Sequence, residues 1–289
     1  MVLYVPKMLS QVVGKLRDYQ FYNFMFLVGL LASFFMGGVL SFLGAGGSIL
    51  TLPILVYLFK INVVDATTYS LLLVGLTALF GCIVGAKEKL IDFKTGIIFG
   101  IPSIIGVVLA RKVIVPYLPD QILIGNFILE KSFLIMILFA LLMLVSSSLM
   151  IRDRKTILTK TNNKNEYEKN IIIILEGLIV GQLTGFVGAG GGFLIIPALV
   201  LLTGLSMNVA VATSLFIIAI KSLMGFGSDL IDGFQTDWMF VLYVCIFTLA
   251  GVFFGRILSK KVSDKQTKKL FGYMTLIISC IIIIEQIIF

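Results

Sequence analysis

Long apolar runs separated by short charged loops constrain this chain of 289 residues more than any other feature. Several runs reach the ~20 residues that a helix needs to cross the hydrocarbon core of a bilayer. Charged residues make up 13% of the chain, about half of the fraction found in soluble domains. The sequence therefore predicts an all-α polytopic membrane protein, because the alternating pattern of a membrane β-barrel is also absent.

The apolar runs fall into two groups with the same internal order. The first group lies within 21–151, the second lies within 171–289, and a charged linker over 152–170 separates them. Each group predicts a helical hairpin bent at a glycine turn, followed by three transmembrane helices. Residues 1–20 mix basic and apolar positions and predict an amphipathic segment at the membrane surface. The expected runs are 21–43, 49–59, 62–86, 95–115, 131–151, 171–187, 193–203, 207–228, 236–258 and 269–289.

A glycine-rich turn occurs once in each group. The first copy is Gly44, Ala45, Gly46, Gly47 and Ser48, with Pro53 downstream; the second is Gly188, Ala189, Gly190, Gly191 and Gly192, with Pro197 downstream. Position 188 lies 144 residues after position 44, and identical residues recur at this offset from positions 37, 42, 50, 55, 56, 58, 66, 70, 71 and 81. The sequence therefore predicts two homologous repeats with one functional turn each.

Basic residues in the loops predict how the repeats face the membrane. Lysine and arginine gather over 152–170 and 256–269, whereas 229–237 carries three aspartates and no base. Because cytoplasmic loops are rich in lysine and arginine, the first two segments are expected inside and the third outside. If both glycine segments are hairpins, the repeats are inverted and the N-terminus lies outside with its bases. A parallel repeat avoids that but places the bases of 256–269 outside, so the inverted arrangement is preferred and the parallel one stays open.

Each glycine turn has the features of an anion site. A helix that begins at membrane depth exposes backbone N–H groups without intrahelical partners, and its N-terminus carries a partial positive charge. Glycine permits positive φ and a close approach of the backbone to a ligand. We therefore assign all residues of both turns, 44–48 and 188–192, to a predicted substrate site. The alternative is that they only permit close helix packing, as expected for isolated glycines such as Gly75 and Gly106.

Three polar residues inside the apolar runs join this predicted site. Lys221 lies within 207–228, where a charge is costly enough to suggest function, although its repeat equivalent is Thr77. Alternatively, Lys221 forms an ion pair with Glu176 or extends its ammonium group toward the interface. Ser70 and Ser214 occupy equivalent positions, and their hydroxyls could donate to an oxyanion or bond to their own helices.

Four further polar residues are weaker candidates. Gln182 and Thr184 precede the second turn directly, and they could add donors to it. Arg111 and Arg256 follow equivalent glycines by five positions and are interpreted as interfacial anchors.

The residue types exclude several classes of function. The chain has no histidine and only three isolated cysteines, so we expect no metal site, no cofactor, no catalytic residue and no enzyme. The basic residues lie between apolar runs, so the net charge of +8 indicates topology signals and lipid headgroup contacts rather than nucleic-acid binding. No Walker A motif is present, so direct coupling to ATP is not expected in this chain.

The paired turns resemble those of the TauE/SafE family, also called the sulfite exporter or toluenesulfonate-uptake-permease group. The segment from Gly185 to Pro197, followed by Ala210 to Leu215, is very similar to the signature of that family. The first half departs from it in having Ser48 where the second half has Gly192, and Tyr69 where the second half has Thr213. The resemblance covers nearly the whole chain and implies export or uptake of small sulfur-containing anions across a prokaryotic inner membrane.

Residues and resemblance together predict a secondary transporter with an anion held at the helix N-termini of the two turns. The resemblance implies sulfite, sulfoacetate or another organosulfonate as the substrate, moved across the cell membrane mainly by export. The expected partners are this small anion and membrane lipids, with a homo-oligomer as an option. The alternatives are a passive anion channel and a transporter of an unrelated small anion or a metal.

Overall fold

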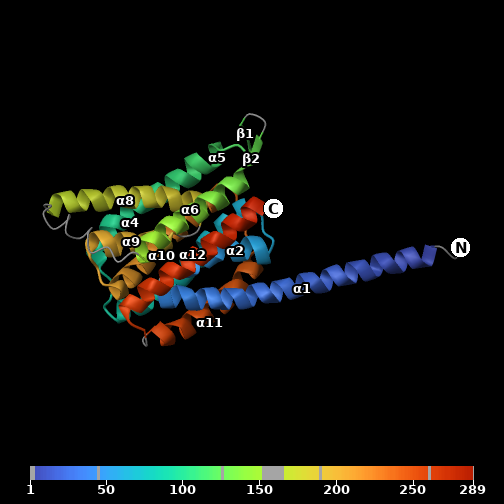
Figure 1. The fold of residues 1–289 in the computed structure, drawn as a ribbon, viewed down its shortest axis with the longest axis horizontal. Helices are drawn as coiled ribbons and strands as arrows, with labels where there is room; N and C mark the ends of the chain where they lie inside the picture. The colour runs from blue at the N-terminus through green and yellow to red at the C-terminus, as the bar shows by residue number, and fades with distance from the viewer. Residues whose placement is uncertain are drawn as a thin grey trace.

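The protein is described by a computed structural model that covers residues 4–43, 46–124, 127–151, 166–188, 191–259 and 262–288. Figure 1 shows one helical bundle, with the N-terminal part of the first helix extending beyond it. The elements are α1 (Tyr4–Leu43), α2 (Gly46–Pro53), η1 (Ile54–Leu58, a π-helical stretch), α3 (Val63–Lys87), α4 (Phe93–Leu109), η2 (Ala110–Ile114, π-helical), α5 (Val115–Tyr117), β1 (Gln121–Ile124), β2 (Phe127–Glu130), α6 (Lys131–Ile151), α8 (Glu166–Val187), α9 (Gly192–Ala198), η3 (Leu199–Thr203, π-helical), α10 (Met207–Ile231), α11 (Trp238–Ser259) and α12 (Asp264–Ile288).

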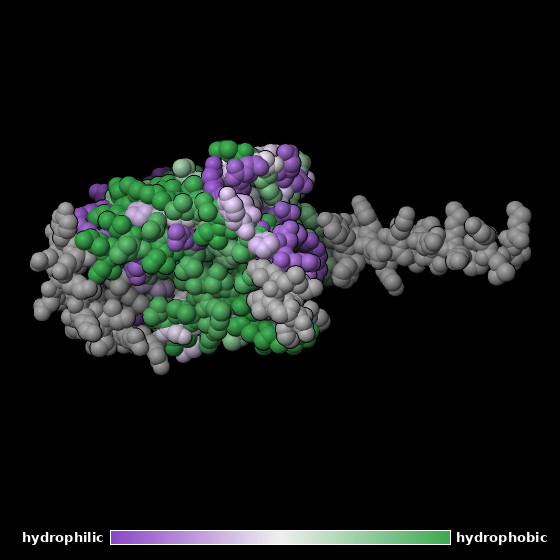
Figure 2. Space-filling model, turned by 90° about the horizontal axis from the view of Figure 1, so that it is seen from above, coloured by the Kyte–Doolittle hydropathy of each residue, from purple (hydrophilic) through white to green (hydrophobic). Residues whose placement is uncertain are grey.

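Eight of the described helical segments are long and apolar enough to cross a membrane. Their outward surfaces carry large apolar side chains, such as Phe35, Ile246 and Ile277, each at least half exposed. Figure 2 shows the broad apolar surface that results on the described part of the bundle. Because such a surface is stable only against lipid, the prediction of a polytopic α-helical membrane protein is confirmed.

A short β-hairpin connects α5 to α6. Its strands β1 and β2 pair antiparallel, with Gln121 opposite Glu130 and Ile124 opposite Phe127. The predicted loop over 116–130 therefore contains regular structure, which is the one departure from an all-helical chain among the described residues.

Two of the predicted domain segments, 1–20 and 152–170, can be compared with the structure. Helix α1 runs without a break from Tyr4 to Leu43, so the segment 1–20 continues directly into the first apolar helix. Most of the predicted linker, 152–165, lies outside the described residues, as do Gly44, Ala45, Ala189 and Gly190 of the two turns.

The helices that precede the two glycine turns pack on equivalent partners. Gly177 and Gly181 of α8 lie against the backbone of Phe99 and Ser103 in α4, so these two helices run parallel. In the same way, α1 and α11 run parallel, since Gly251 and Gly255 lie against Phe34 and Gly38. Small residues at these contacts let the backbones approach closely, as predicted for the isolated glycines.

The central pair of helices, α3 and α10, occupies equivalent places in the two halves and packs antiparallel. Gly75 lies against Leu223, and ten residues further along α3 Gly85 lies against Ala212 of α10. The start of α10 also lies beside the start of α4, because the Asp92 amide donates to the Thr213 hydroxyl at 3.0 Å. Since α4 and α8 run parallel, α8 and α10 begin at the same end of the bundle. The stretch from α8 through α9 and η3 therefore starts and finishes at the same end of the bundle, as expected for the predicted hairpin.

Charged side chains differ between the two ends of the bundle. Lys87, Lys89 and Lys94 lie at the end where α3 finishes and α4 begins, whereas Asp232 and Asp237 lie at the opposite end, between α10 and α11. By the positive-inside rule, the first end is expected to face the cytoplasm.

Candidate functional site

The second glycine turn has a backbone that other residues adopt only with strain. Gly188 has φ of +72° and Gly191 has φ of +69°, both in the left-handed region. Side chains also crowd the turn: a Cβ atom at position 191 would lie 2.7 Å from Nζ of Lys221, and closer still to Cβ and Cγ2 of Thr184. Glycine is required here by both conformation and space.

Lys221 extends from α10 directly to this turn. The residue is 1% exposed, and its Nζ donates to the Thr184 hydroxyl at 2.9 Å. Among the described residues no carboxylate lies within ion-pair distance of Lys221, so the alternative partner Glu176 is not its partner. Extension of Lys221 toward the interface is likewise ruled out by its burial. The structure thus brings the predicted Lys221, Gly191 and Thr184 together.

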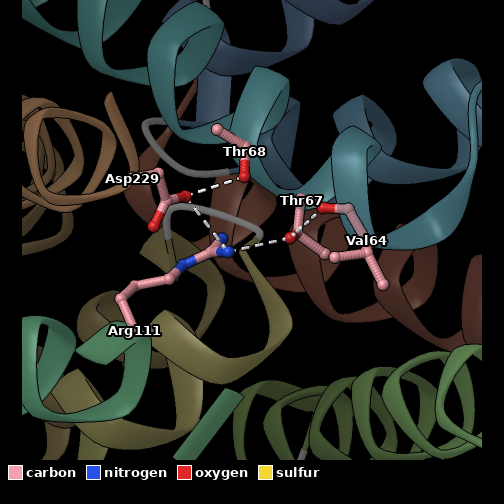
Figure 3. A network of polar contacts seen from close by, with 5 residues as sticks. All are labelled: Val64, Thr67, Thr68, Arg111 and Asp229. Atoms are coloured by element: carbon pink, nitrogen blue, oxygen red, sulfur yellow. Dashed lines mark hydrogen bonds and ion pairs between the residues drawn. The ribbon is translucent and has the colours of Figure 1, made fainter. Parts of the chain in front are cut away.

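A second cation, Arg111, lies at the same turn, and Figure 3 shows its polar contacts. Its Nη1 is 3.2 Å from Oδ2 of Asp229 and donates to the Thr67 hydroxyl at 3.0 Å. The Asp229 carboxylate also accepts from the Thr68 hydroxyl at 2.7 Å, while Thr67 donates to the Val64 carbonyl at 2.6 Å. Arg111 is only 4% exposed, so its interpretation as an interfacial anchor is wrong.

The guanidinium of Arg111 faces the first residue of the turn. A Cβ atom at position 188 would lie 2.7 Å from Arg111 Nη2 and 2.6 Å from the Cα of Thr67. The absence of a side chain at Gly188 therefore lets the turn pack directly on Arg111. Two buried cations, one from η2 and one from α10, contact the two ends of a single glycine turn.

The first glycine turn is surrounded differently. Its described residues Gly46, Gly47 and Ser48 begin α2, where Ser48 is fully buried. The equivalent of Lys221 on this side is Thr77, whose hydroxyl bonds to the Leu73 and Val74 carbonyls of its own helix. Helices α2 and α9 contact each other, so the two glycine segments meet inside the bundle.

The two predicted serines behave differently. Ser214 donates to the Val211 carbonyl at 2.8 Å, which is the local bond expected for serine in a membrane helix. Ser70 is fully buried, and its hydroxyl has no hydrogen-bond partner within the described residues. Gly192 begins α9, so it belongs to the helix start as predicted, and Gln182 is partly buried on α8.

A cavity of about 500 Å³ lies toward the end of the bundle where α3 finishes and α4 begins. Two of its lining residues are polar, Ser41 at the end of α1 and Arg256 of α11; Gly81 and Leu215 contribute from the central helices. Arg256 forms an ion pair with Glu88. This pair joins an arginine of the second half to a carboxylate of the first, as Arg111 and Asp229 join the halves in the opposite sense.

The sequence analysis missed Arg111, Asp229 and Thr67 as members of the site. The signal that could have found Arg111 is its recurrence as Arg256, which was noted and assigned to the interface. Asp229 was counted only as a topology signal, because its partner lies in the other half of the chain.

Comparison with known proteins places the chain among membrane transporters. A family model described as "Sulfite exporter TauE/SafE" matches residues 26–282. The chain is 29% identical over 283 residues to a protein of Bacillus subtilis named "Probable membrane transporter protein YunE", covering 90% of this chain and 97% of that protein. It is 26% identical over 255 residues to a "Probable membrane transporter protein" of Xylella fastidiosa, covering 86% and 91%. It is 28% identical to MJ0441 of Methanocaldococcus jannaschii, covering 69% and 67%. No solved structure matches significantly.

Proposed function

This chain belongs to the sulfite exporter TauE/SafE family and is a multi-pass membrane transporter; from that premise we propose that it exports a small sulfur-containing anion by a secondary mechanism. Sulfite, sulfoacetate and other organosulfonates are the proposed substrates. The anion binds where the two glycine segments meet, at the described residues of the turns together with Lys221, and Ser70 is a further donor. The proposal also includes Gly44, Ala45, Ala189, Gly190 and Ser214.

The observation that carries this proposal is the position of Lys221. Its ammonium group lies beside a glycine turn in the interior of a membrane protein, with one threonine hydroxyl as its hydrogen-bond partner. A cation in such a place is costly unless it is paired with an anion. Helix α9 begins at Gly192, directly after Gly191, so the positive end of its dipole lies close to Lys221.

The relation between the repeats supports alternating access. The equivalent helices α3 and α10 pack antiparallel, and α1 packs on α11 as α8 packs on α4. Both features favour an inverted rather than a parallel repeat, and inverted repeats place the substrate where their broken helices meet. Rocking of one repeat against the other would then open the site to each side in turn.

Export agrees with the two ends of the bundle. The cavity beside Arg256 opens space toward the cytoplasmic end, whereas Arg111 at the opposite end is 4% exposed. We propose that in this conformation the anion enters from the cytoplasmic end. A membrane potential that is negative inside favours its exit by roughly 2.3 kcal/mol per charge for each 100 mV.

Counterflow in proteoliposomes tests this function. Vesicles with purified protein are loaded with unlabelled sulfite, and uptake of labelled sulfite is followed at concentrations that saturate a carrier. We expect transient accumulation that Lys221→Met reduces at least tenfold, because the substrate loses its cation. Thr77→Val, at the equivalent position of the other repeat, is the matched control and should transport normally. Flux that is unsaturable and shows no counterflow would favour the passive channel, and normal transport by Lys221→Met would remove the lysine from the site.

A further inference from the structure

The guanidinium of Arg111 has two edges in different environments. The amino group Nη1 is occupied by Asp229 at 3.2 Å and by Thr67 at 3.0 Å. The other two nitrogens, Nε and Nη2, are buried and have no hydrogen-bond partner among the described residues. The side chain as a whole is 2% exposed. A buried charged donor without a partner is expensive, so it calls for an explanation.

The two unpartnered nitrogens form one functional edge. Nε and Nη2 carry parallel N–H groups, and this is the fork through which arginine binds two oxygens of one carboxylate, phosphate or sulfonate group. Because Nη2 faces Gly188, this edge points to the glycine turn and not to the lipid. Asp229 and Thr67 bind Nη1, on the other edge of the guanidinium, so the fork is fixed in place before any ligand arrives.

We propose that Arg111 is a substrate-binding residue, and that its Nε and Nη2 atoms hold two oxygens of an oxyanion against the second glycine turn. This inference rests on the proposed function and narrows it. The site then selects anions by shape: a ligand needs two oxygens on one central atom, as sulfite and sulfonates have. A halide is also negatively charged, but as a single sphere it cannot offer a separate oxygen to each of the two donors. Lys221 contributes positive charge at the other end of the turn, whereas Arg111 provides the selectivity for oxyanions.

Binding measurements on the purified full-length protein in detergent test this assignment. Sulfite, methanesulfonate and chloride are titrated separately by calorimetry at constant ionic strength. The wild-type protein should prefer both oxyanions to chloride. Arg111→Lys keeps the charge next to Asp229 but lacks the fork, so its oxyanion affinity should fall roughly tenfold to a hundredfold, the worth of one charged hydrogen bond. Chloride affinity should change little.

Two further variants keep the test decisive if Arg111→Lys does not fold. The double variant Arg111→Met with Asp229→Leu removes both charges, and buried ion pairs replaced in this way are often neutral for stability; it should fold and lose the preference for oxyanions. Thr68→Val removes a donor to Asp229 without contacting the guanidinium, so it should keep that preference.

The outcomes separate the two proposals. A wild-type protein that prefers neither oxyanion to chloride would overturn the proposed function together with this inference. A wild-type preference that persists in Arg111→Lys or in the folded double variant would overturn only the inference and leave Arg111 as a structural residue.

Discussion

Replacing Gly191 by alanine places a methyl group where side-chain atoms already lie. The new Cβ would be 2.7 Å from Nζ of Lys221, whereas ordinary contacts of a Cβ are 3.4–4 Å. Lys221 can withdraw its flexible end, but Thr184 cannot move as easily, because its Cβ and Cγ2 are close to the backbone of α8 and lie nearer still to the new methyl group. The substitution therefore strains the turn and pushes the lysine from it.

The expected cost has two parts. A left-handed backbone costs a non-glycine residue roughly 1–2 kcal/mol, and Gly191 has φ of +69°. Overpacking by a methyl group in a closely packed interior adds roughly 1–3 kcal/mol. Gly191→Ala should therefore destabilise the protein by roughly 2–5 kcal/mol. The same change should weaken sulfite binding, since the lysine loses its position.

Gly227→Ala is the matched control on α10. A Cβ atom at this position meets nothing within 4 Å, and the backbone is helical. Alanine is favoured over glycine in a helix by up to about 1 kcal/mol, so this variant should be as stable as the wild type or slightly more stable. Unfolding is followed with a thiol-reactive dye that reports exposure of the buried Cys245, with Cys82 and Cys280 replaced by serine in every protein.

If the Gly191→Ala protein is as stable to unfolding as the Gly227→Ala control, this reasoning is refuted. It would mean that the turn relaxes without cost, and that neither the positive φ nor the contact with Lys221 is a constraint on the sequence. Loss of stability with unchanged sulfite affinity would refute only the link between the turn and the position of Lys221.

Two further predictions concern the polar groups around the turn. Asp229→Asn leaves the buried Arg111 without its counter-ion and should destabilise the protein by roughly 3–5 kcal/mol in the same unfolding assay, whereas the double apolar variant should recover most of this loss. Ser70→Ala should leave stability equal or higher, since it removes an unpartnered buried hydroxyl, but calorimetry should show weaker sulfite binding.

The order and length of the helices could be predicted because they depend on local composition. The run expected over 62–86 is α3 from Val63 to Lys87, and the run over 207–228 is the core of α10 from Met207 to Ile231. Lipid requires an uninterrupted apolar stretch of fixed length, so the pattern is visible in any single segment. The β-hairpin between α5 and α6 was not predicted, because its short strands lie outside the apolar runs.

The candidate site could be predicted only in part, because burial of a charge depends on distant partners. Lys221 stands in the middle of an apolar run, so its position alone indicates function. Arg111 lies near the end of such a run, where most arginines reach the interface. What buries it is a carboxylate of the other repeat and a glycine of the second turn, Asp229 and Gly188, and neither is adjacent in sequence.

The two ion pairs between the repeats lie in different environments, and this difference bears on how the protein could change conformation. Arg111 with Asp229 is buried at one end of the bundle, while Arg256 with Glu88 is partly exposed beside a cavity at the other end. Each pair joins an arginine near the end of the fourth apolar run of its repeat to a carboxylate of the other repeat, near the end of α10 or α3. If the repeats exchange conformations, as alternating access requires, the environments of the two pairs exchange as well. Two homologous halves could then open one end while closing the other, and under the proposed function the cations at the second turn select the ligand.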